Sequence, residues 1–339
     1  METLLGAEPR FRGGLRKVAA GVHAWLQPNG SWGESNAVLI VGEGESLLID
    51  TLWTPALTAR MLDRMKRLTR AAPITRLVNT HADGDHWWGN EHLAGREIVA
   101  SRAAAEEMTE LTPQALQQFQ RLGELVTRAG DLPLPYPGRA RLASLGQLVG
   151  GMLGSYDYSN ITLTPPTRTF SGALELDVGG RRVELIEVGP AHTFGDTIVH
   201  VPDVRVVIAA DILFIGVTPI MWAGTADNWI AAIDRLIDLG PAAIVPGHGP
   251  PTDVGGARTV QDYWRHVDAA ARRRFADGES PRVAAAAVLG SQEFTSSPFA
   301  AWDNPERLAV NMHTIRRGTA RPVRPAERIR ALSDAAALA

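Results

Sequence analysis

Residues 79–90 read NTHADGDHWWGN and bring two histidines, two aspartates and two tryptophans together over positions 81–88. The whole chain of 339 residues has only nine histidines. The stretch follows ITRLVNT (74–80), whose apolar and β-branched residues predict a strand that ends at the polar cluster. Loops at strand ends, fixed by a rigid sheet, are where metal ligands and catalytic groups collect. The stretch therefore predicts a functional site at a strand end.

Composition limits the classes of function. Hydrophobic residues make up 45% and charged residues 21% of the chain, as in ordinary globular proteins. A net charge of -3 gives no sign of a nucleic-acid or membrane partner, so a small-molecule substrate is expected. The absence of cysteine excludes disulfides, thiolate ligands and a cysteine nucleophile. No apolar leader or membrane-length run is visible, and we expect a cytoplasmic protein.

Strand and helix patterns alternate along the chain. Strands separated by tight turns are expected over residues 16–50, including NAVLIV (36–41) and SLLID (46–50). Further strands are expected at REIVAS (96–101), ALELDV (173–178), RRVELIEV (181–188), TIVHV (197–201), RVVIAADILF (205–214) and AAIVPGHGP (242–250). Amphipathic helices are expected at 54–68, with Thr54 as N-cap, and at 227–239. These elements predict an α/β protein with sheets inside and helices outside.

Two regions differ from this alternation. Residues 102–165 predict a helical insertion, interrupted by DLPLPYPG (131–138), that could form a wall or lid over the site. From residue 257 the chain again reads as helical. We therefore expect a catalytic domain over 1–256 and a helical C-terminal extension over 257–339, packed on the same domain.

Three further polar groups lie at or near predicted strand ends. They are His192 in GPAHTFGDT, Asp211 in AADILF and His248 in VPGHGP. Each alone could be a capping or loop residue. Nearby glycines (Gly84, Gly189, Gly247 and Gly249) would let the backbone turn sharply and bring short side chains to one point. Together with the 81–86 cluster, imidazoles and carboxylates suit zinc, iron or manganese.

The order of these clusters resembles the metallo-β-lactamase superfamily, whose signature is His-x-His-x-Asp-His followed by a distant His, Asp and His. The resemblance extends from about residue 20 to 250 and includes LLID ending at Asp50. It implies an αββα sandwich with a two-metal site at one edge of the paired sheets. The expected cofactor is one or two Zn²⁺ ions, with iron or manganese as alternatives.

The resemblance also implies a role for each residue of the site. One metal would be bound by His81, Asp83, His192 and Asp211, and the second by Asp85, His86, Asp211 and His248. Asp50 would be structural and would orient the metal-binding loop. Asp83, Asp85 and Asp211 would be the catalytic carboxylates.

Asp83 departs from the family pattern, because most members have histidine at this position. Asp83 could ligate, as a glutamate does in the flavodiiron branch; it could bind its metal weakly and leave one firm site; or it could be a general base. We favour ligation. The sequence His-x-Asp-Gly-Asp-His resembles a variant branch that includes the chlorothalonil hydrolytic dehalogenase.

The expected reaction is hydrolysis, because bound metal lowers the pKa of water to about 7 and supplies hydroxide to attack an electrophilic carbon. Tryptophans in predicted loops (Trp32, Trp87, Trp88 and Trp222) favour a small apolar or aromatic ester, thioester, lactone or lactam. The alternatives are hydrolytic dehalogenation of chlorinated aromatics and a non-catalytic, metal-stabilised binding protein. His313 either contacts the site or packs on a C-terminal helix, and these helices could form a homodimer.

Overall fold

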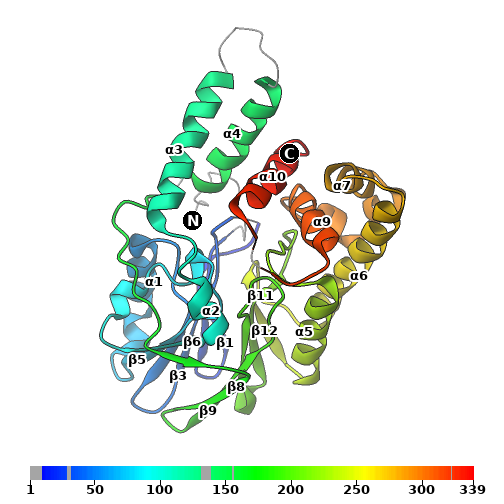
Figure 1. Cartoon of the computed structure of the whole chain (residues 1–339). Helices are drawn as coiled ribbons and strands as arrows, with labels where there is room; N and C mark the ends of the chain where they lie inside the picture. Colours follow the sequence, from blue (N-terminus) through cyan, green and yellow to red (C-terminus); the bar gives the residue numbers. More distant parts are fainter. Residues whose placement is uncertain (1–9, 29–31, 131–138, 155, 322) are drawn as a thin grey trace.

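Two β-sheets pack face to face with helices on their outer sides (Figure 1). The computed structural model describes residues 10–28, 32–130, 139–154, 156–321 and 323–339. The sheets hold seven strands in the order β1-β2-β3-β4-β5-β6-β7 and five in the order β12-β11-β10-β9-β8. This arrangement confirms the predicted αββα sandwich.

The strands have the following bounds. The first sheet contains β1 (Gly14–Ala19), β2 (Val22–Leu26), β3 (Ala37–Val41), β4 (Ser46–Ile49), β5 (Ile74–Val78), β6 (Glu97–Ser101) and β7 (Arg168–Phe170). The second contains β8 (Ala173–Val178), β9 (Arg181–Glu187), β10 (Thr197–Val201), β11 (Val206–Phe214) and β12 (Ala243–His248). The strand patterns in the sequence predicted most of these elements, but β7 was missed because three residues are too few to show a period.

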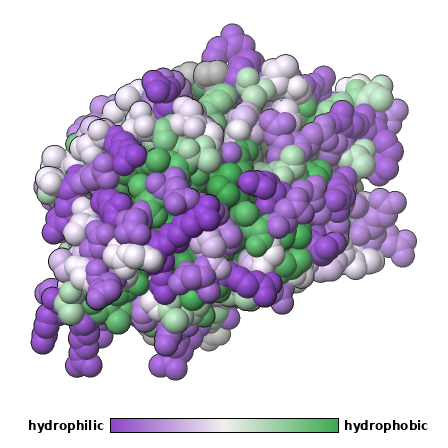
Figure 2. Space-filling model, turned by 90° about the horizontal axis from the view of Figure 1, so that it is seen from below, coloured by the Kyte–Doolittle hydropathy of each residue, from purple (hydrophilic) through white to green (hydrophobic). Residues whose placement is uncertain are grey.

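The inner faces of the two sheets form one apolar layer. Val38, Ile49 and Val78 from the first sheet are in the same buried cluster as Val199 and Ile208 from the second. Strands β4, β10 and β11 are buried at every position, because helices cover the sheet faces that point away from this layer. Seen from below, hydrophobic residues show across the middle of the molecule and hydrophilic residues surround them (Figure 2).

The helices have the following bounds. They are α1 (Pro55–Thr69), α2 (Arg102–Glu107), α3 (Pro113–Gly130), α4 (Arg139–Leu153), α5 (Ala226–Asp238), α6 (Val254–Ala276), α7 (Pro281–Leu289), α8 (Gln292–Thr295), α9 (Arg307–Arg317) and α10 (Pro325–Ala336). Thr54 caps α1 as predicted, since its side chain accepts a hydrogen bond from the Leu57 amide. Across the described ranges, none of these helices combines the length and apolar character that a membrane span needs.

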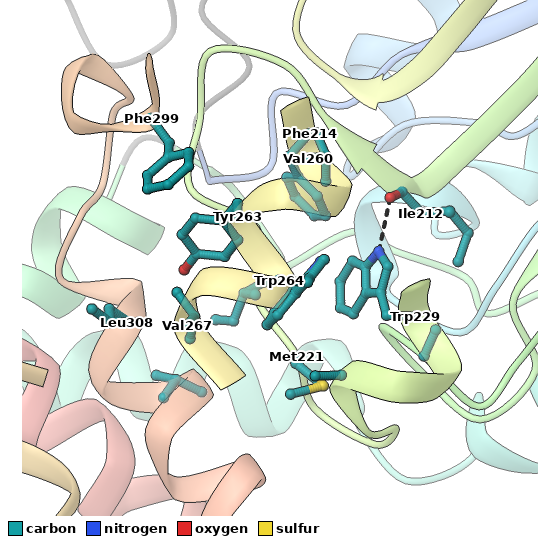
Figure 3. Close-up of a cluster of buried hydrophobic side chains, with 14 of the residues drawn as sticks. Ile212, Phe214, Met221, Trp229, Val260, Tyr263, Trp264, Val267, Phe299 and Leu308 are labelled. Carbon is teal, nitrogen blue, oxygen red and sulfur yellow. Dashed lines mark hydrogen bonds between the residues drawn. The ribbon is translucent and has the colours of Figure 1, made fainter. Parts of the chain in front are cut away.

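Helices α5 and α6 cover the second sheet through an aromatic cluster (Figure 3). Trp229 on α5 and Trp264 on α6 lie with ring centroids 4.5 Å apart. The Trp229 indole donates a hydrogen bond of 2.9 Å to the Ile212 carbonyl on β11, so its one polar atom is satisfied inside the core. The C-terminal helices contribute residues to the same cluster. The domain boundary expected between residues 256 and 257 falls inside α6, and the division into two parts remains a prediction.

The region 102–165 contains α2, α3 and α4, and α3 and α4 form a hairpin that projects from the body of the molecule (Figure 1). The interrupting segment DLPLPYPG lies outside the described residues. Helix α10 packs against α4, so the C-terminal helices contact the helical insertion.

Glu107 at the end of α2 ties this insertion to the loop that carries His192. Its side chain accepts a hydrogen bond of 2.9 Å from the Phe194 amide. Burial raises the pKa of Glu107 from 4.5 to about 8; the carboxylates of Asp83 and Asp196 add to this shift, and the Phe194 hydrogen bond opposes it. The folded state therefore binds this proton more tightly than the unfolded state does.

We expect Glu107→Gln to remove a pH-dependent loss of stability. Because the folded pKa lies above the unfolded value, the free energy of unfolding of the wild type falls as pH rises from about 4.5 to about 8. Glutamine stays neutral and can still accept the Phe194 hydrogen bond. The variant should match the wild type near pH 4 and exceed it by up to a few kcal/mol above pH 8, as measured by urea unfolding. Glu106→Gln, at an exposed neighbouring position, is the control and should keep the pH dependence of the wild-type free energy of unfolding. The same change of pH dependence in both variants would contradict the prediction.

Candidate metal centre

Seven histidine and aspartate side chains converge at one end of the two sheets. His81, Asp83, Asp85 and His86 lie in the loop and short 3-10 helix that follow β5, His192 lies between β9 and β10, Asp211 lies on β11, and His248 ends β12. The structure thus brings together every residue that the sequence predicted as a ligand. Six of them are buried, and the Asp83 side chain is 37% exposed.

Asp211 lies at the centre of the group. Its Oδ1 lies 3.2 Å from His86 Nε2, and its Oδ2 lies 3.3 Å from both His192 Nε2 and His248 Nε2. His81 Nε2 is 3.8 Å from Asp211 Oδ2. One carboxylate thus faces four imidazole nitrogens, as a residue that bridges two metals would.

Two other carboxylates mark the two sides of the group. Asp83 Oδ2 lies 3.0 Å from His192 Nε2. Asp85 Oδ2 lies 3.6 Å from His86 Nε2 and 3.5 Å from His248 Nε2. Potential ligand atoms of His81, Asp83 and His192 lie within 4.8 Å of one another, as do those of Asp85, His86 and His248. A third group, His81, His86 and Asp211, takes one histidine from each of these sets, so Asp211 lies between them, as a carboxylate shared by two metals would.

Asp50 fixes the orientation of two of the histidines. Its Oδ2 lies 2.9 Å from His86 Nδ1 and accepts a hydrogen bond of 2.7 Å from the Thr80 hydroxyl. The Thr80 oxygen lies 3.0 Å from His81 Nδ1. With Nδ1 of each ring engaged, Nε2 of each is free to ligate, which is the usual role of such outer-shell partners. Asp50 adopts φ 62°, a strained conformation consistent with this positioning task.

The loop that carries His192 is closed by Asp196. The Asp196 carboxylate accepts hydrogen bonds from the backbone amides of Ala191 and Thr193 and from the Thr193 hydroxyl. His192 Nδ1 donates to the Ile220 carbonyl at 2.7 Å, which leaves Nε2 toward Asp211. Asp196 lies in the same GPAHTFGDT motif as His192, and the sequence analysis overlooked it.

The buried donors fit a divalent metal. In the described part of the chain, His81 Nε2, His86 Nε2 and Asp211 Oδ1 are buried and have no hydrogen-bond partner. Such atoms are costly to bury unless something satisfies them, and coordination to a cation would do so. A set of imidazole and carboxylate donors suits zinc, iron or manganese.

Charge within the group keeps Asp83 ionised. Burial would raise the pKa of Asp83, but the hydrogen bond and charge of His192 outweigh it and lower the pKa to about 2. Burial likewise opposes charge on His192, yet Asp211 and Asp83 raise the pKa of His192 to about 10. Asp83 is thus a carboxylate at neutral pH, the form that binds metal, and metal would have to displace the proton on His192.

Glycine at position 247 leaves room for the Asp211 side chain, because the backbone there passes close to its carboxylate. A Cβ atom at Gly247 would lie 1.8 Å from Asp211 Oδ1, and a Cβ atom at Gly84 would lie 2.5 Å from the Trp88 ring. Ala210, directly before Asp211, has φ 45°. The backbone is therefore shaped around the carboxylate, as the glycines in the sequence had suggested.

A cavity of about 470 Å³ opens above the metal-binding side chains. Its apolar wall comes from the helical insertion, β11, α10 and the connections β2–β3, β4–α1 and β11–α5. It includes Trp32, Trp53, Leu116, Phe119, Met152, Phe214, Ile220, Trp222 and Leu332. Trp32 and Trp222 thus lie where the sequence analysis expected substrate contacts. The insertion supplies part of the wall, as predicted.

Trp87 and Trp88 require a correction, because neither lines this cavity. They are 2% and 1% exposed, respectively. The Trp87 indole donates to the Ala82 carbonyl at 2.9 Å, and Trp88 packs edge-on against Tyr158. Both belong to the hydrophobic cluster behind the metal loop. They support the metal loop from behind, and the prediction that they contact substrate is wrong for this cavity.

His313 also lies away from the metal cavity. Its Nε2 is 2.9 Å from Asp334 Oδ2, which joins α9 to α10. Of the two readings of this histidine, packing between helices is the one consistent with its position.

Arg307, at the start of α9, is the functional candidate that sequence reasoning missed. It lines the cavity although it is only 1% exposed, and its guanidinium lies 4.1 Å from the centre of the Trp32 ring. Its Nη1 donates to the Thr218 carbonyl at 2.9 Å, while its Nε is buried and, within the described residues, has no hydrogen-bond partner. No motif marks it, because only the tertiary fold brings α9 beside β11.

Curated relatives match about two thirds of the chain. The chain is 26% identical over 222 residues to the 2,4-dinitroanisole O-demethylase subunit alpha of a Nocardioides species, covering 64% of this chain and 53% of that protein. It is 25% identical over 229 residues to the linear primary-alkylsulfatase of a Pseudomonas species, covering 65% of this chain and 42% of that protein. The chain thus spans about half the length of these relatives.

Solved structures share the fold. An inverting sec-alkylsulfatase from a Pseudomonas species superposes with a TM-score of 0.63 at 17% identity, covering 89% of this chain and 49% of that chain. A metallo-beta-lactamase from Pontibacter korlensis superposes with a TM-score of 0.50 at 17% identity, covering 75% of this chain and 99% of that chain. The sequence profile of the metallo-beta-lactamase superfamily matches residues 30–248, well over half of the chain. The protein belongs to the metallo-beta-lactamase superfamily.

Proposed function

We propose that the protein is a metal-dependent hydrolase that cleaves an ester-type bond in a small substrate with an apolar or aromatic body. The observation that carries this proposal is the cluster of metal-binding side chains at the floor of the aromatic cavity. Carboxylic esters, thioesters, lactones and lactams fit such a cavity, since one apolar portion can pack on its wall while the polar group faces the floor.

Bound divalent metal would polarise the scissile group and make water nucleophilic near neutral pH. The protein's own side chains supply the rest. Asp50 and the Ile220 carbonyl hold His86 and His192 in the orientation that points Nε2 inward. Asp85 and Asp211 are buried carboxylates at the floor that can accept the proton lost by water. The apolar wall excludes bulk water and orients the substrate body.

A sulfate ester is a second candidate, and Arg307 is the observation that favours it. A guanidinium fork matches the oxygens of a sulfate group, and Arg307 lines the cavity as a cation beside the floor carboxylates. Two relatives are named as alkylsulfatases, which supports this candidate, and a third acts on the aryl ether 2,4-dinitroanisole. Cleavage of an aryl chloride remains a further alternative with the same aromatic cavity.

The first test is turnover of a substrate panel. Aryl esters, thioesters, lactones, β-lactams, alkyl sulfates, aryl methyl ethers and chlorinated aromatics should be assayed with the purified protein. We expect turnover of at least one ester class, its loss on chelation, and its return when Zn²⁺ or Mn²⁺ is added. Asp211→Asn should lower kcat by a factor of about 100 or more, because it removes the central charge. A protein that is inert toward the whole panel but unfolds on chelation would instead be a metal-stabilised binding protein.

The role of Asp83 can be read from metal content. We propose that Asp83 ligates, and we expect about two metals per chain in the wild type, about one in Asp83→Ala and a return toward two in Asp83→His, as measured by elemental mass spectrometry. Asp63→Ala, at an exposed position of α1, is the matched control and should retain both. One metal in both the wild type and Asp83→Ala would instead indicate that Asp83 is a general base beside a single metal.

Substitution of Arg307 should affect the hydrolysis of sulfate esters more than that of neutral esters. We expect Arg307→Met to lower kcat/KM for an alkyl sulfate by about ten- to a hundredfold, the usual cost of a lost hydrogen bond to a charged group, and to lower it far less for a neutral ester of the same chain length. Arg307→Lys keeps the charge and should recover part of the loss. Equal losses on both substrates would show that Arg307 only supports the cavity wall.

A further inference from the structure

A second cavity lies between α9 and α10, beside the metal cavity. Its volume is about 330 Å³. Trp222, Val323 and Arg328 line both cavities, so the two spaces adjoin along these side chains. Helices α9 and α10 are neighbours at the end of the molecule where the insertion also lies (Figure 1).

The lining of this second cavity is strongly basic. Five arginines contribute to it: Arg316, Arg317, Arg321, Arg328 and Arg330. Glu327 is the acidic residue of the lining, and it pairs with Arg321 at 3.0 Å and with Arg324 at 2.7 Å. Glu327 is therefore already engaged, and the remaining arginines give the cavity an excess of positive charge.

Arg317 is held in the cavity wall by two backbone carbonyls. Its Nη2 donates to the Trp222 carbonyl at 2.7 Å and its Nε to the Thr319 carbonyl at 3.2 Å. Burial lowers the pKa of Arg317, the nearby charge of Arg321 lowers it further, and the charge of Glu327 opposes both. Because Glu327 already pairs with Arg321 and Arg324, an anion in the cavity would add to the stabilisation of Arg317.

Arg328 faces both cavities. Its guanidinium lies 5.0 Å from the centre of the Trp222 ring, which holds the side chain against the wall between them. Its Nε is buried and, over the described ranges, forms no hydrogen bond. Because Arg328 also lines the cavity, its guanidinium charge can attract an anion that enters there.

We propose that this arginine-lined cavity binds an oxyanion, namely a carboxylate, sulfate or phosphate group, through Arg317 and Arg328. The planar guanidinium forks match oxyanions in geometry as well as in charge. An oxyanion on the substrate could occupy this cavity while its reacting bond lies in the metal cavity; a free anion could occupy it independently. The inference goes beyond the proposed hydrolase, because binding requires no turnover.

Calorimetric titration of sulfate into the metal-loaded protein tests the proposal. We expect millimolar or tighter binding to the wild type, about tenfold or more weaker binding to Arg317→Gln, and substantial recovery in Arg317→Lys. Arg265→Gln on α6, which also removes one arginine charge from the surface, is the control and should bind as the wild type does. No measurable binding to the wild type, or heat that is unchanged in Arg317→Gln because sulfate sits on the metals, would overturn the proposal. If Arg317→Gln fails to fold, Arg328→Gln in the same lining should weaken sulfate binding about tenfold, and unchanged binding in that variant would overturn the proposal.

Paired substrates then identify the source of the oxyanion. A nitrophenyl ester whose acyl chain ends in a carboxylate is compared with its neutral counterpart of equal length. A preference for the charged ester that Arg317→Gln abolishes, while turnover of the neutral ester is kept, places the oxyanion on the substrate. No preference, together with Arg317-dependent sulfate binding, assigns the cavity to a free anion. If neither ester is turned over, the proposed function is in doubt, but the calorimetric result still decides whether the cavity binds an oxyanion.

Discussion

The structure depends on Asp211, a carboxylate buried at a position where its charge costs free energy. Asp211 lies on β11, a strand buried at every position, and its side chain is surrounded by imidazoles. A charge in such a place must be compensated, and the histidines and a bound cation are the groups available to do it. The glycine at 247 and the positive φ of Ala210 are explained by the same carboxylate, because each gives it space or aims it. Local backbone strain here is consistent with a functional site.

Hydrogen bonds from Asn36 join the two sheets at the end where Asp211 and His248 lie. The side-chain amide of Asn36, just before β3, donates to the carbonyls of Pro246 and Gly249, and its backbone amide donates to the Gly247 carbonyl. These bonds join the first sheet to the turn that carries His248. Because the candidate ligands come from both sheets, their spacing is only as precise as this junction. A site on rigid strand ends can therefore keep buried, unpaired donors aimed at one point.

Much of the fold and the site could be read from the sequence, for identifiable reasons. Strand periodicity, the Thr54 cap and polar residues at strand ends are local signals, and they predicted the sheets and the convergence of His81, Asp211 and His248. The errors concern long-range packing. Trp87 and Trp88 were predicted as loop residues that contact substrate, but they pack behind the metal loop, and nothing local separates those two environments. Arg307 reaches the cavity only through the docking of α9, so its role has no sequence motif.

Asp83 connects the metal centre to the basic side of the molecule. Replacing a neutral imidazole by a carboxylate adds negative charge to the first metal position. His192 compensates part of it by direct contact, and the charge of Arg328 on α10 acts in the same direction on the pKa of Asp83. Arg328 in turn lines the arginine cavity. An anion bound there would offset part of the positive charge near Asp83 and so strengthen the attraction between this carboxylate and a metal ion bound beside it. The aspartate and the C-terminal arginines are therefore best understood as one electrostatic unit, in which a change at either end alters the charge that the metal site experiences.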